Sequence, residues 1–418
     1  MDYHVSLKTK ELFDKVVALE AVQKGITFIE EDNNQSIEEQ IALTLIESPT
    51  FHEQTRAEAY CKYFEALGLV DVHVDEFNNA IGIWKGTGQG PNILVEAHLD
   101  TVFPFGSVTE VIRDGNILRA PGIVDDTRGL AVLLSSLRGL KSSGIKTLGD
   151  IYFVGTAREE GMGSLGGMKD FLDHHQEIDA SVSVDGAWID GIVYEATGFK
   201  TYEVNFYGIG GHAYGAFGKM ANPLHAAARA IAKIADFHVS EDPRTTFCVS
   251  NFHAGNDAGV HAIVPQATIK FNFRSNSQEL LEELNTRIFA AIQEACDEET
   301  ARWGQDAITW DKKQYCEVPA GSQNINAPIV EATYLAASYL GGDVYFSQGG
   351  SVNGNMAVAR GLPCVTLGGG KIDINVHNLN EFYPTDGAHK LPQEVFILLC
   401  ILAGIDGSTP SLVAKNNN

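Results

Sequence analysis

Two kinds of hydrophobic pattern alternate along the first half of the chain. Some apolar residues form short unbroken runs, such as Ile93–Val95 within Asn92–Ala97, which is typical of a strand covered on both faces. Others recur with a helical period, as the leucines and valines of Thr127–Lys141 do. This alternation predicts an α/β domain with a mainly parallel sheet. The other segments predicted in this half are helices at 36–69 and Gly166–His175 and strands at Val72–Phe77, Ile81–Trp84, Asp150–Thr156 and Ala180–Val184.

A different pattern begins near residue 198. Lys200–Tyr207 alternates apolar and polar side chains, as a strand with one exposed face does. Helices are predicted at Pro223–Phe237 and Gln278–Trp303, and further strands at Thr245–Phe252, Ile263–Phe273 and Ala307–Tyr315. The order predicts a ferredoxin-like βαββαβ domain at 199–314, inserted into a larger domain formed by 1–198 and 315–418. In the last part the α/β pattern returns, with helices at 324–340, Asn353–Arg360 and Gln393–Ile405 and strands at Val344–Phe346 and Cys364–Leu367.

Composition excludes several classes of function. The 418 residues suffice for two domains, and a formal net charge of −24 disfavours binding to nucleic acid phosphates. Residues 1–30 contain no long apolar run, so we expect neither a signal peptide nor a membrane span, and a cytoplasmic location. The 6 cysteines lie far apart without a CxxC pair, which predicts free thiols. Any metal ion is therefore expected to be held by oxygen and imidazole ligands.

Histidine and carboxylate side chains gather where predicted strands end. His98 ends a buried strand, and Asp100, two residues on, points to the same side and could hold the second imidazole nitrogen. Glu159 and Glu160 follow another buried strand, and because neighbouring side chains point different ways, one could bind a cation while the other acts as a base. The remaining candidates are Asp125 before the helix at Thr127, Asp185 at the end of Ala180–Val184, and His377 after a glycine-rich turn.

These segments are expected to meet, because ligands of an open α/β sheet collect beyond the carboxyl ends of its strands. Two histidines, two aspartates and one glutamate suit two borderline cations, with one carboxylate bridging them. Two cations about 3.5–4 Å apart would activate a water and polarise a carbonyl group. Glu159 would take the proton of the water and pass it to the leaving amine. The residues thus predict a two-metal hydrolase that cuts an amide bond.

Each residue also has a simpler interpretation when it is taken alone. His98 and His377 would be ordinary core and loop histidines, and Asp125 and Asp126 would be helix N-cap residues. Asp185 would begin a turn with its glycine neighbour, and the two glutamates would form a solvated acidic turn. The joint occurrence of all these residues favours the metal site.

One glycine-rich motif is a rival signal. Residues 161–166 fit the pattern GxGxxG of a dinucleotide-binding turn, after a strand and before a helix. Four residues separate the strand from the glycines, and two of them, Glu159 and Glu160, would face the pyrophosphate. We therefore reject a dinucleotide cofactor and a dinucleotide oxidoreductase.

Taken in order, these segments resemble the motifs of the di-zinc hydrolase family that includes aminoacylase, carboxypeptidase G, peptidase T and acetylornithine deacetylase. The resemblance covers almost the whole chain. It implies a catalytic domain with two zinc ions, for which cobalt or manganese could substitute. By this resemblance His98 and Asp185 hold one zinc, Glu160 and His377 hold the other, and Asp125 bridges them. Glu159 is then the general base, and Asp100 belongs with it to the predicted catalytic residues.

The inserted domain is similar to the lid and dimerisation domain of the same family. Gly210–Tyr214 resembles its lid motif, which implies that His212 stabilises the oxyanion in the active site of a partner subunit. Arg274 resembles a lid arginine that anchors a substrate carboxylate. The implied partner is a second copy of the chain. Without the resemblance, His212 is a surface residue of the lid and Arg274 an ordinary ion-pair residue.

The substrate is less well defined, because the chain departs from the family pattern at Thr127-Arg128, Arg158, His261 and Ser351–Asn355. Among relatives, an aspartate at the position of Asp185 accompanies aminopeptidases and dipeptidases, which favours short peptides with a free amino end. An N-acyl amino acid deacylase or a carboxypeptidase on the same metals is the alternative. A metal-binding protein without catalysis is a remote alternative, because both Glu159 and His212 are present.

Overall fold

The computed structural model of the chain describes residues 3–256, 258–303, 307–371 and 374–416. The chain forms two compact units, one of Met1–Ala196 with Ser322–Asn418 and one of Thr197–Gly321. The domain boundaries predicted from the sequence, at 199 and 314, fall inside the second unit. Each unit has its own hydrophobic core, so each is described by itself.

The first unit is built on a mixed sheet of eight strands in the order β1-β2-β6-β3-β7-β16-β8-β15. Its four central strands, β6, β3, β7 and β16, are parallel to one another, whereas β1, β2 and β8 each pair antiparallel with a neighbour. The strands span Val70–Val74 (β1), Ala80–Trp84 (β2), Asn92–His98 (β3), Ile151–Thr156 (β6), Ile178–Val184 (β7), Trp188–Val193 (β8), Tyr345–Ser347 (β15) and Cys364–Gly368 (β16).

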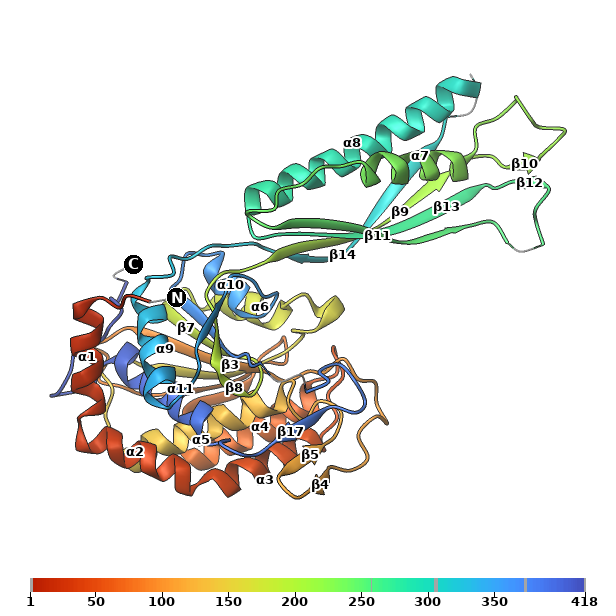
Figure 1. The fold of residues 1–418 in the computed structure, drawn as a ribbon. Helices are drawn as coiled ribbons and strands as arrows, with labels where there is room; N and C mark the ends of the chain where they lie inside the picture. The colour runs from red at the N-terminus through yellow and green to blue at the C-terminus, as the bar shows by residue number, and fades with distance from the viewer. Residues whose placement is uncertain (1–2, 257, 304–306, 372–373, 417–418) are drawn as a thin grey trace. The chain divides into compact units, whose positions relative to one another are not determined.

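Helices cover both faces of this sheet (Figure 1). The α5 helix (Thr127–Ser143) packs on β3 and is buried along most of its length, as its many apolar residues predict. Outside it lie α2 and α3, while α6 and α10 lie on the opposite face. The remaining helices of the unit are α1 (Leu7–Val17), α2 (Glu20–Glu31), α3 (Asn33–Thr44), α4 (Gln54–Leu67), α6 (Gly166–His174), α9 (Pro328–Tyr339), α10 (Gly354–Val358) and α11 (Lys390–Ala403).

The amino-terminal part of the chain differs from the prediction. The single helix expected at 36–69 is two helices, α3 and α4, because Pro49 stands between them and bridges to Thr101. The helices α1 and α2 were not predicted; Ser6 caps α1 by accepting the N–H of Thr9. Both helices are amphipathic, so the sequence carries a helical period in this part of the chain that the prediction did not include.

A small antiparallel sheet adjoins the main one. It consists of β4 (Ile112–Asp114), β5 (Ile117–Arg119) and β17 (Phe382–Pro384), in the order β17-β5-β4. The pairing of β17 with β5 brings the carboxyl-terminal loop that contains His377 beside the loop that contains Asp125.

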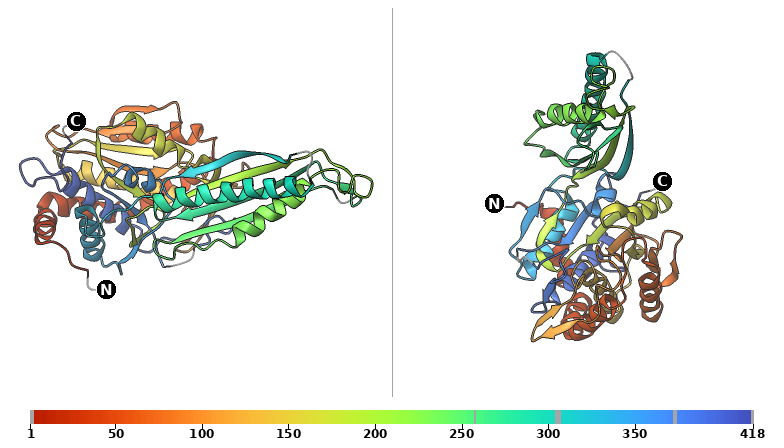
Figure 2. Two further views of the ribbon diagram at one scale, coloured as in Figure 1. Left: turned by 90° about the horizontal axis from the view of Figure 1, so that it is seen from above. Right: turned by 90° about the vertical axis from the view of Figure 1, so that its right-hand side faces the viewer.

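The second unit is a four-stranded antiparallel sheet in the order β11-β13-β9-β14, with α7 and α8 on one face (Figure 2). Its strands are β9 (Gly198–Tyr207), β11 (Thr245–Ala254), β13 (Gln266–Ser275) and β14 (Thr309–Val318), and its helices are α7 (Pro223–Ala235) and α8 (Gln278–Trp303). Tyr202, Val204 and Phe206 point from β9 into the core, and the residues between them are half-buried. The predicted fold class is confirmed, with a mainly parallel α/β sheet and an inserted βαββαβ domain.

The inserted domain also contains a short two-stranded ribbon. A short ribbon of β10 (Gly211–His212) and β12 (Ala262–Ile263) extends from the inserted sheet. Among the described residues, no helix is long and apolar enough to cross a membrane.

Candidate metal centre

Three neighbouring parallel strands deliver the candidate ligands to one edge of the main sheet. His98 is the last residue of β3, Asp185 follows β7 directly, and Glu159 and Glu160 lie just beyond β6. Because β6, β3 and β7 are adjacent and parallel, their carboxyl ends lie together, where such sheets bind ligands.

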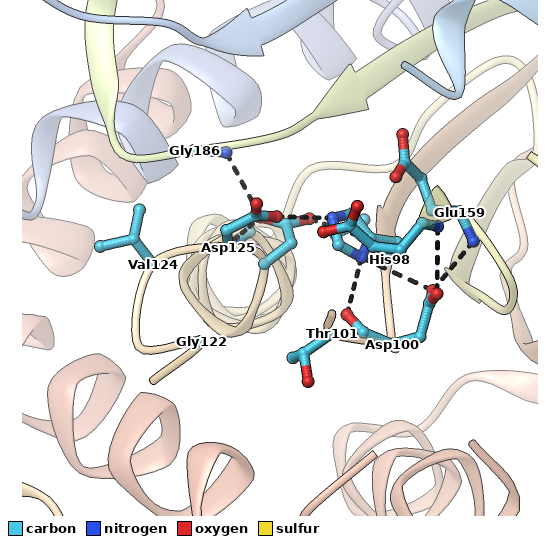
Figure 3. Close-up of polar contacts among 12 residues, drawn as sticks. His98, Asp100, Thr101, Gly122, Val124, Asp125, Glu159 and Gly186 are labelled. Atoms are coloured by element: carbon cyan, nitrogen blue, oxygen red, sulfur yellow. Dashed lines mark hydrogen bonds and ion pairs between the residues drawn. The ribbon is translucent and has the colours of Figure 1, made fainter. Parts of the chain in front are cut away.

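The imidazole of His98 lies between two aspartates (Figure 3). Its Nε2 is 2.8 Å from Oδ1 of Asp125. Its Nδ1 is 2.9 Å from the backbone carbonyl of Asp100, and the Asp100 carboxylate lies farther from it, at 3.7 Å. The ring is therefore oriented by the main chain of Asp100, so that Nε2 is the nitrogen available to a cation.

The carboxylate of Asp125 stands between the two histidines. While Oδ1 contacts His98, Oδ2 lies 2.9 Å from Nε2 of His377, whose other partner is Oε1 of Glu160 at 2.9 Å. Two imidazoles on opposite oxygens of one carboxylate form the arrangement that a bridging ligand requires.

The candidate ligand atoms form overlapping groups. In each group the atoms all lie within 4.8 Å of one another. The two groups that share Asp125 add His98 and Asp185 in one case and Glu160 and His377 in the other, and a third group joins His98 to Glu159 and Glu160. Imidazole and carboxylate donors of this number suit two borderline divalent cations such as zinc, manganese or cobalt.

Electrostatics also favour cations at this position. Burial raises the pKa of Glu159 well above its usual value, and the nearby Asp185 and Glu160 raise it further. Removal from water, together with Asp125, raises the pKa of Asp185 to about 7. In the part of the chain that the structure describes, Asp125 and Glu160 form ion pairs with the two histidines and with no lysine or arginine. Hydrogen bonds to Asp125 and Glu160 raise the pKa of His377 to about 10, so the imidazoles carry the positive charge that bound cations would replace.

Asp100 supports the glutamate pair. It is fully buried, and its two oxygens accept the backbone N–H groups of Glu159 at 2.9 Å and Glu160 at 3.1 Å. The hydroxyl of Thr50 donates to the same carboxylate at 2.9 Å. Asp100 thus fixes the backbone of the turn that carries Glu159 and Glu160.

Two further buried carboxylates hold backbone amides at the site. The sequence predicted a helix cap at Asp126, which the structure confirms, but it predicted no role for Glu381. Asp126 caps α5 and accepts the N–H groups of His98 at 3.0 Å and Gly186 at 3.3 Å. Glu381 accepts the N–H groups of three residues in the loop that carries Asp125. Burial raises the pKa of Glu381 to about 7, although these backbone donors oppose the shift. No spacing or periodicity in the sequence marks a carboxylate whose partners are distant main-chain groups.

The departures from the family pattern occupy supporting positions. Arg128 is buried, donates to the backbone carbonyl of Ala388 at 2.6 Å and lies over the ring of Tyr383. The guanidinium of Arg158 stacks 4.0 Å from the centre of the Phe77 ring. Asn353 donates to the buried Glu96 at 2.8 Å. Each makes a packing or hydrogen-bond contact inside the first unit.

The predicted lid residues lie in the second unit. His212 is exposed on β10, and its Nδ1 accepts the N–H groups of Tyr214 and Gly215, each at 3.2 Å. With Nδ1 as acceptor, the ring proton of a neutral imidazole is on Nε2, which is free to donate.

Arg274 donates to Asn272 and lies over the ring of Phe199. His261, the remaining departure, is exposed, and its carbonyl accepts the N–H of Ala213. The contribution of His212 and Arg274 to the metal centre remains a prediction.

Comparisons with known proteins extend the picture. Residues 194–300 match a peptidase dimerisation domain. The chain is 27% identical over 380 residues to the uncharacterised protein YqjE of Bacillus subtilis, covering 87% of this chain and 97% of that protein. It is 26% identical over 353 residues to succinyl-diaminopimelate desuccinylase 2 of Alteromonas mediterranea, covering 78% and 86%. Its fold is similar to that of a tripeptidase of Staphylococcus aureus, with a TM-score of 0.75 and 24% identity over 89% of this chain and 98% of that one.

Proposed function

Because the chain belongs to the M20 family of metallopeptidases and related metallohydrolases, we propose that it hydrolyses the amino-terminal amide bond of short peptides. The observation that carries the proposal is the shared carboxylate of Asp125, which contacts His98 on one oxygen and His377 on the other.

Two divalent cations, zinc in the first instance, fit the donor set. His98 and Asp185 would hold one and Glu160 and His377 the other, with Asp125 common to both. When bound, such a pair polarises a carbonyl group and lowers the pKa of water. Burial and neighbouring carboxylates raise the pKa values of Glu159 and Asp185, which supports this occupancy, because bound cations would remove the repulsion among the carboxylates.

Glu159 is the proposed general base. Its carboxylate belongs to the group around His98, and its backbone is fixed by Asp100, yet no ligand role is needed for it once Glu160 contacts His377. It would take a proton from the attacking water and deliver it to the leaving amine. Burial, with the nearby carboxylates, raises the pKa of Glu159, which makes it a stronger proton acceptor than an ordinary carboxylate.

The inserted domain would complete the site. We propose that it joins two copies of the chain, and that Nε2–H of His212 from one copy donates to the oxyanion formed at the metal centre of the other. Arg274 would anchor a carboxylate of the substrate. The match of residues 194–300 to a peptidase dimerisation domain supports the homodimer.

The alternative reaction on the same residues is deacylation of an acyl amino acid. A desuccinylase is among the relatives, and a tripeptidase is among the proteins of similar fold, so both classes are represented. Asp185 favours the peptidase, as the family resemblance implies.

A substrate panel on the metal-loaded protein tests the proposal. We expect cleavage of unblocked dipeptides and tripeptides, and little cleavage of N-acetyl or N-succinyl amino acids or of peptides with a blocked amino group. Preference for the acylated substrates would establish the alternative, and no amide hydrolysis at all would contradict both.

The variant Glu159→Ala serves as the matched control for the panel. It should retain both metal ions, measured by elemental analysis, and lose about 100-fold or more of the rate of peptide cleavage, because the proton acceptor is removed. An active Glu159→Ala protein would exclude Glu159 as the base while leaving the metal site intact.

A further inference from the structure

Glu381 is a buried carboxylate whose side chain accepts hydrogen bonds from backbone N–H groups of the metal centre. Its side chain has no exposed surface. Oε1 accepts the N–H groups of Val124 at 2.7 Å and Asp125 at 3.0 Å, and Oε2 accepts the N–H of Gly122 at 2.9 Å. Both oxygens are thus engaged by three main-chain donors of one loop.

The same residue belongs to the loop that presents His377. The N–H of Glu381 donates to the carbonyl of Asn378 at 2.9 Å, and the N–H of Phe382 closes the loop on Ile374 at 3.2 Å. On the other side, Phe382 pairs with Arg119 at the start of the β17–β5 ladder, and the N–H of Ala120 donates to the Glu381 carbonyl at 3.3 Å. The strand register therefore places Glu381 directly against the loop of Asp125.

The two candidate cation positions differ in how they are supported. His98 and the Asp185 turn are tied together by Asp126, through the N–H groups of His98 and Gly186. Asp125 and His377 lie on the two segments that Glu381 joins. Loss of Glu381 would therefore disturb two of the three ligands at the position with Glu160, namely Asp125 and His377. At the other position it would disturb only the shared Asp125 and leave His98 and Asp185 in place.

We propose that Glu381 is a positioning residue that builds the cation position of Asp125, Glu160 and His377 by clamping their two loops together, without binding a cation itself. The inference rests on the proposed metal centre. It assigns separate supports to the two positions: Glu381 to one and Asp126 to the other.

The test is a titration of the metal-free, full-length protein with zinc chloride by calorimetry, and with cobalt chloride by visible absorption. In Glu381→Gln the side chain keeps its size, but its NH2 group must face a backbone N–H in either orientation. We expect the affinity of one of the two ions to fall about 10–100-fold while that of the other stays within a few-fold of the wild type. The cobalt spectrum should show one retained environment and one lost or altered.

Glu394→Gln is the matched control. Glu394 is another fully buried carboxylate of the same unit, on α11, and neither of its oxygens has a hydrogen-bond partner within the described residues. Both ions should bind to this variant with wild-type affinity.

A second variant, Glu381→Asp, covers the case in which Glu381→Gln does not fold. Its carboxylate keeps the charge but is on a side chain shorter by one methylene group, so it cannot reach all three donors, and the affinity for the same ion should fall.

A titration of either folded variant that matches the wild type would overturn the proposal. So would equal weakening of both ions together with a lower melting temperature of the metal-free protein, which would mean a general structural role. Failure of the wild-type protein to cleave peptides while it binds two ions would contradict the proposed function and leave this inference standing.

Discussion

At the scale of single residues, the carboxylates of the site are distinguished by the partners that their oxygens meet. Asp125 and Asp126 are neighbours in the chain, but Asp125 faces two imidazoles while Asp126 accepts backbone N–H groups. Asp100 resembles Asp126 in this respect. A carboxylate saturated by main-chain donors is fixed in place and has little capacity left for a cation, so it orients the ligands around it.

The crowding of these carboxylates predicts an unusual pH dependence for the metal-free protein. Asp185 has a pKa raised from 3.8 to about 7, and the pKa of Glu159 is also raised. The folded state therefore binds more protons than the unfolded state, so this contribution to stability is complete below about pH 4 and is lost as the pH rises through 7. We expect the melting temperature of the metal-free protein to decrease as the pH is raised from 5 to 8.

Thermal unfolding with and without manganese chloride checks this prediction. Cations require deprotonated ligands, so the loaded protein should gain stability relative to the metal-free protein as the pH rises. Asp185→Asn should flatten the pH dependence of the metal-free protein. A melting temperature that rises with pH in the absence of metal would contradict this account of the charges.

At the scale of helices and strands, prediction succeeded where burial leaves a simple pattern. The apolar runs of β3, β6 and β7 indicated strands covered on both faces, and all three are buried throughout or nearly so. The β8 strand was not predicted, because Asp190 and Gly191 interrupt its apolar residues. The helices α1 and α2 were missed although each carries an apolar stripe with a helical period.

The same distinction explains which parts of the site the sequence could indicate. His98, Asp185 and the Glu159-Glu160 pair were expected to meet because each follows a strand of one parallel sheet, and the structure brings them together. His377 was a candidate because it follows a glycine-rich turn, but no strand positions it, and its assignment to one cation came from the family resemblance. Glu381 could not be found, because its partners are main-chain groups more than 250 residues away in the sequence, whose positions depend on the pairing of β17 with β5.

At the scale of the whole molecule, the homodimer makes a prediction about shared active sites. If His212 acts on the metal centre of the other copy, Glu159→Ala inactivates the site of its own subunit, whereas His212→Ala inactivates the site of the partner subunit. A mixed dimer then holds one site with both defects and one intact site. After subunit exchange, an equal mixture of the two variants should recover about a quarter of the wild-type rate, because half of the dimers are mixed.

The control is a mixture of Glu159→Ala with the double variant Glu159→Ala/His212→Ala, which contains no intact site in any combination. Absence of recovery in the first mixture, despite exchange detected by labelled subunits, would show that His212 does not act across the dimer.

The central claim is that side chains from five segments hold a pair of cations around Asp125. The most direct measurement is anomalous diffraction at the zinc edge from crystals of the zinc-loaded protein. The account predicts two peaks about 3.5–4 Å apart, one beside His98 and Asp185 and the other beside Glu160 and His377. A single peak, or peaks that avoid Asp125, would contradict it.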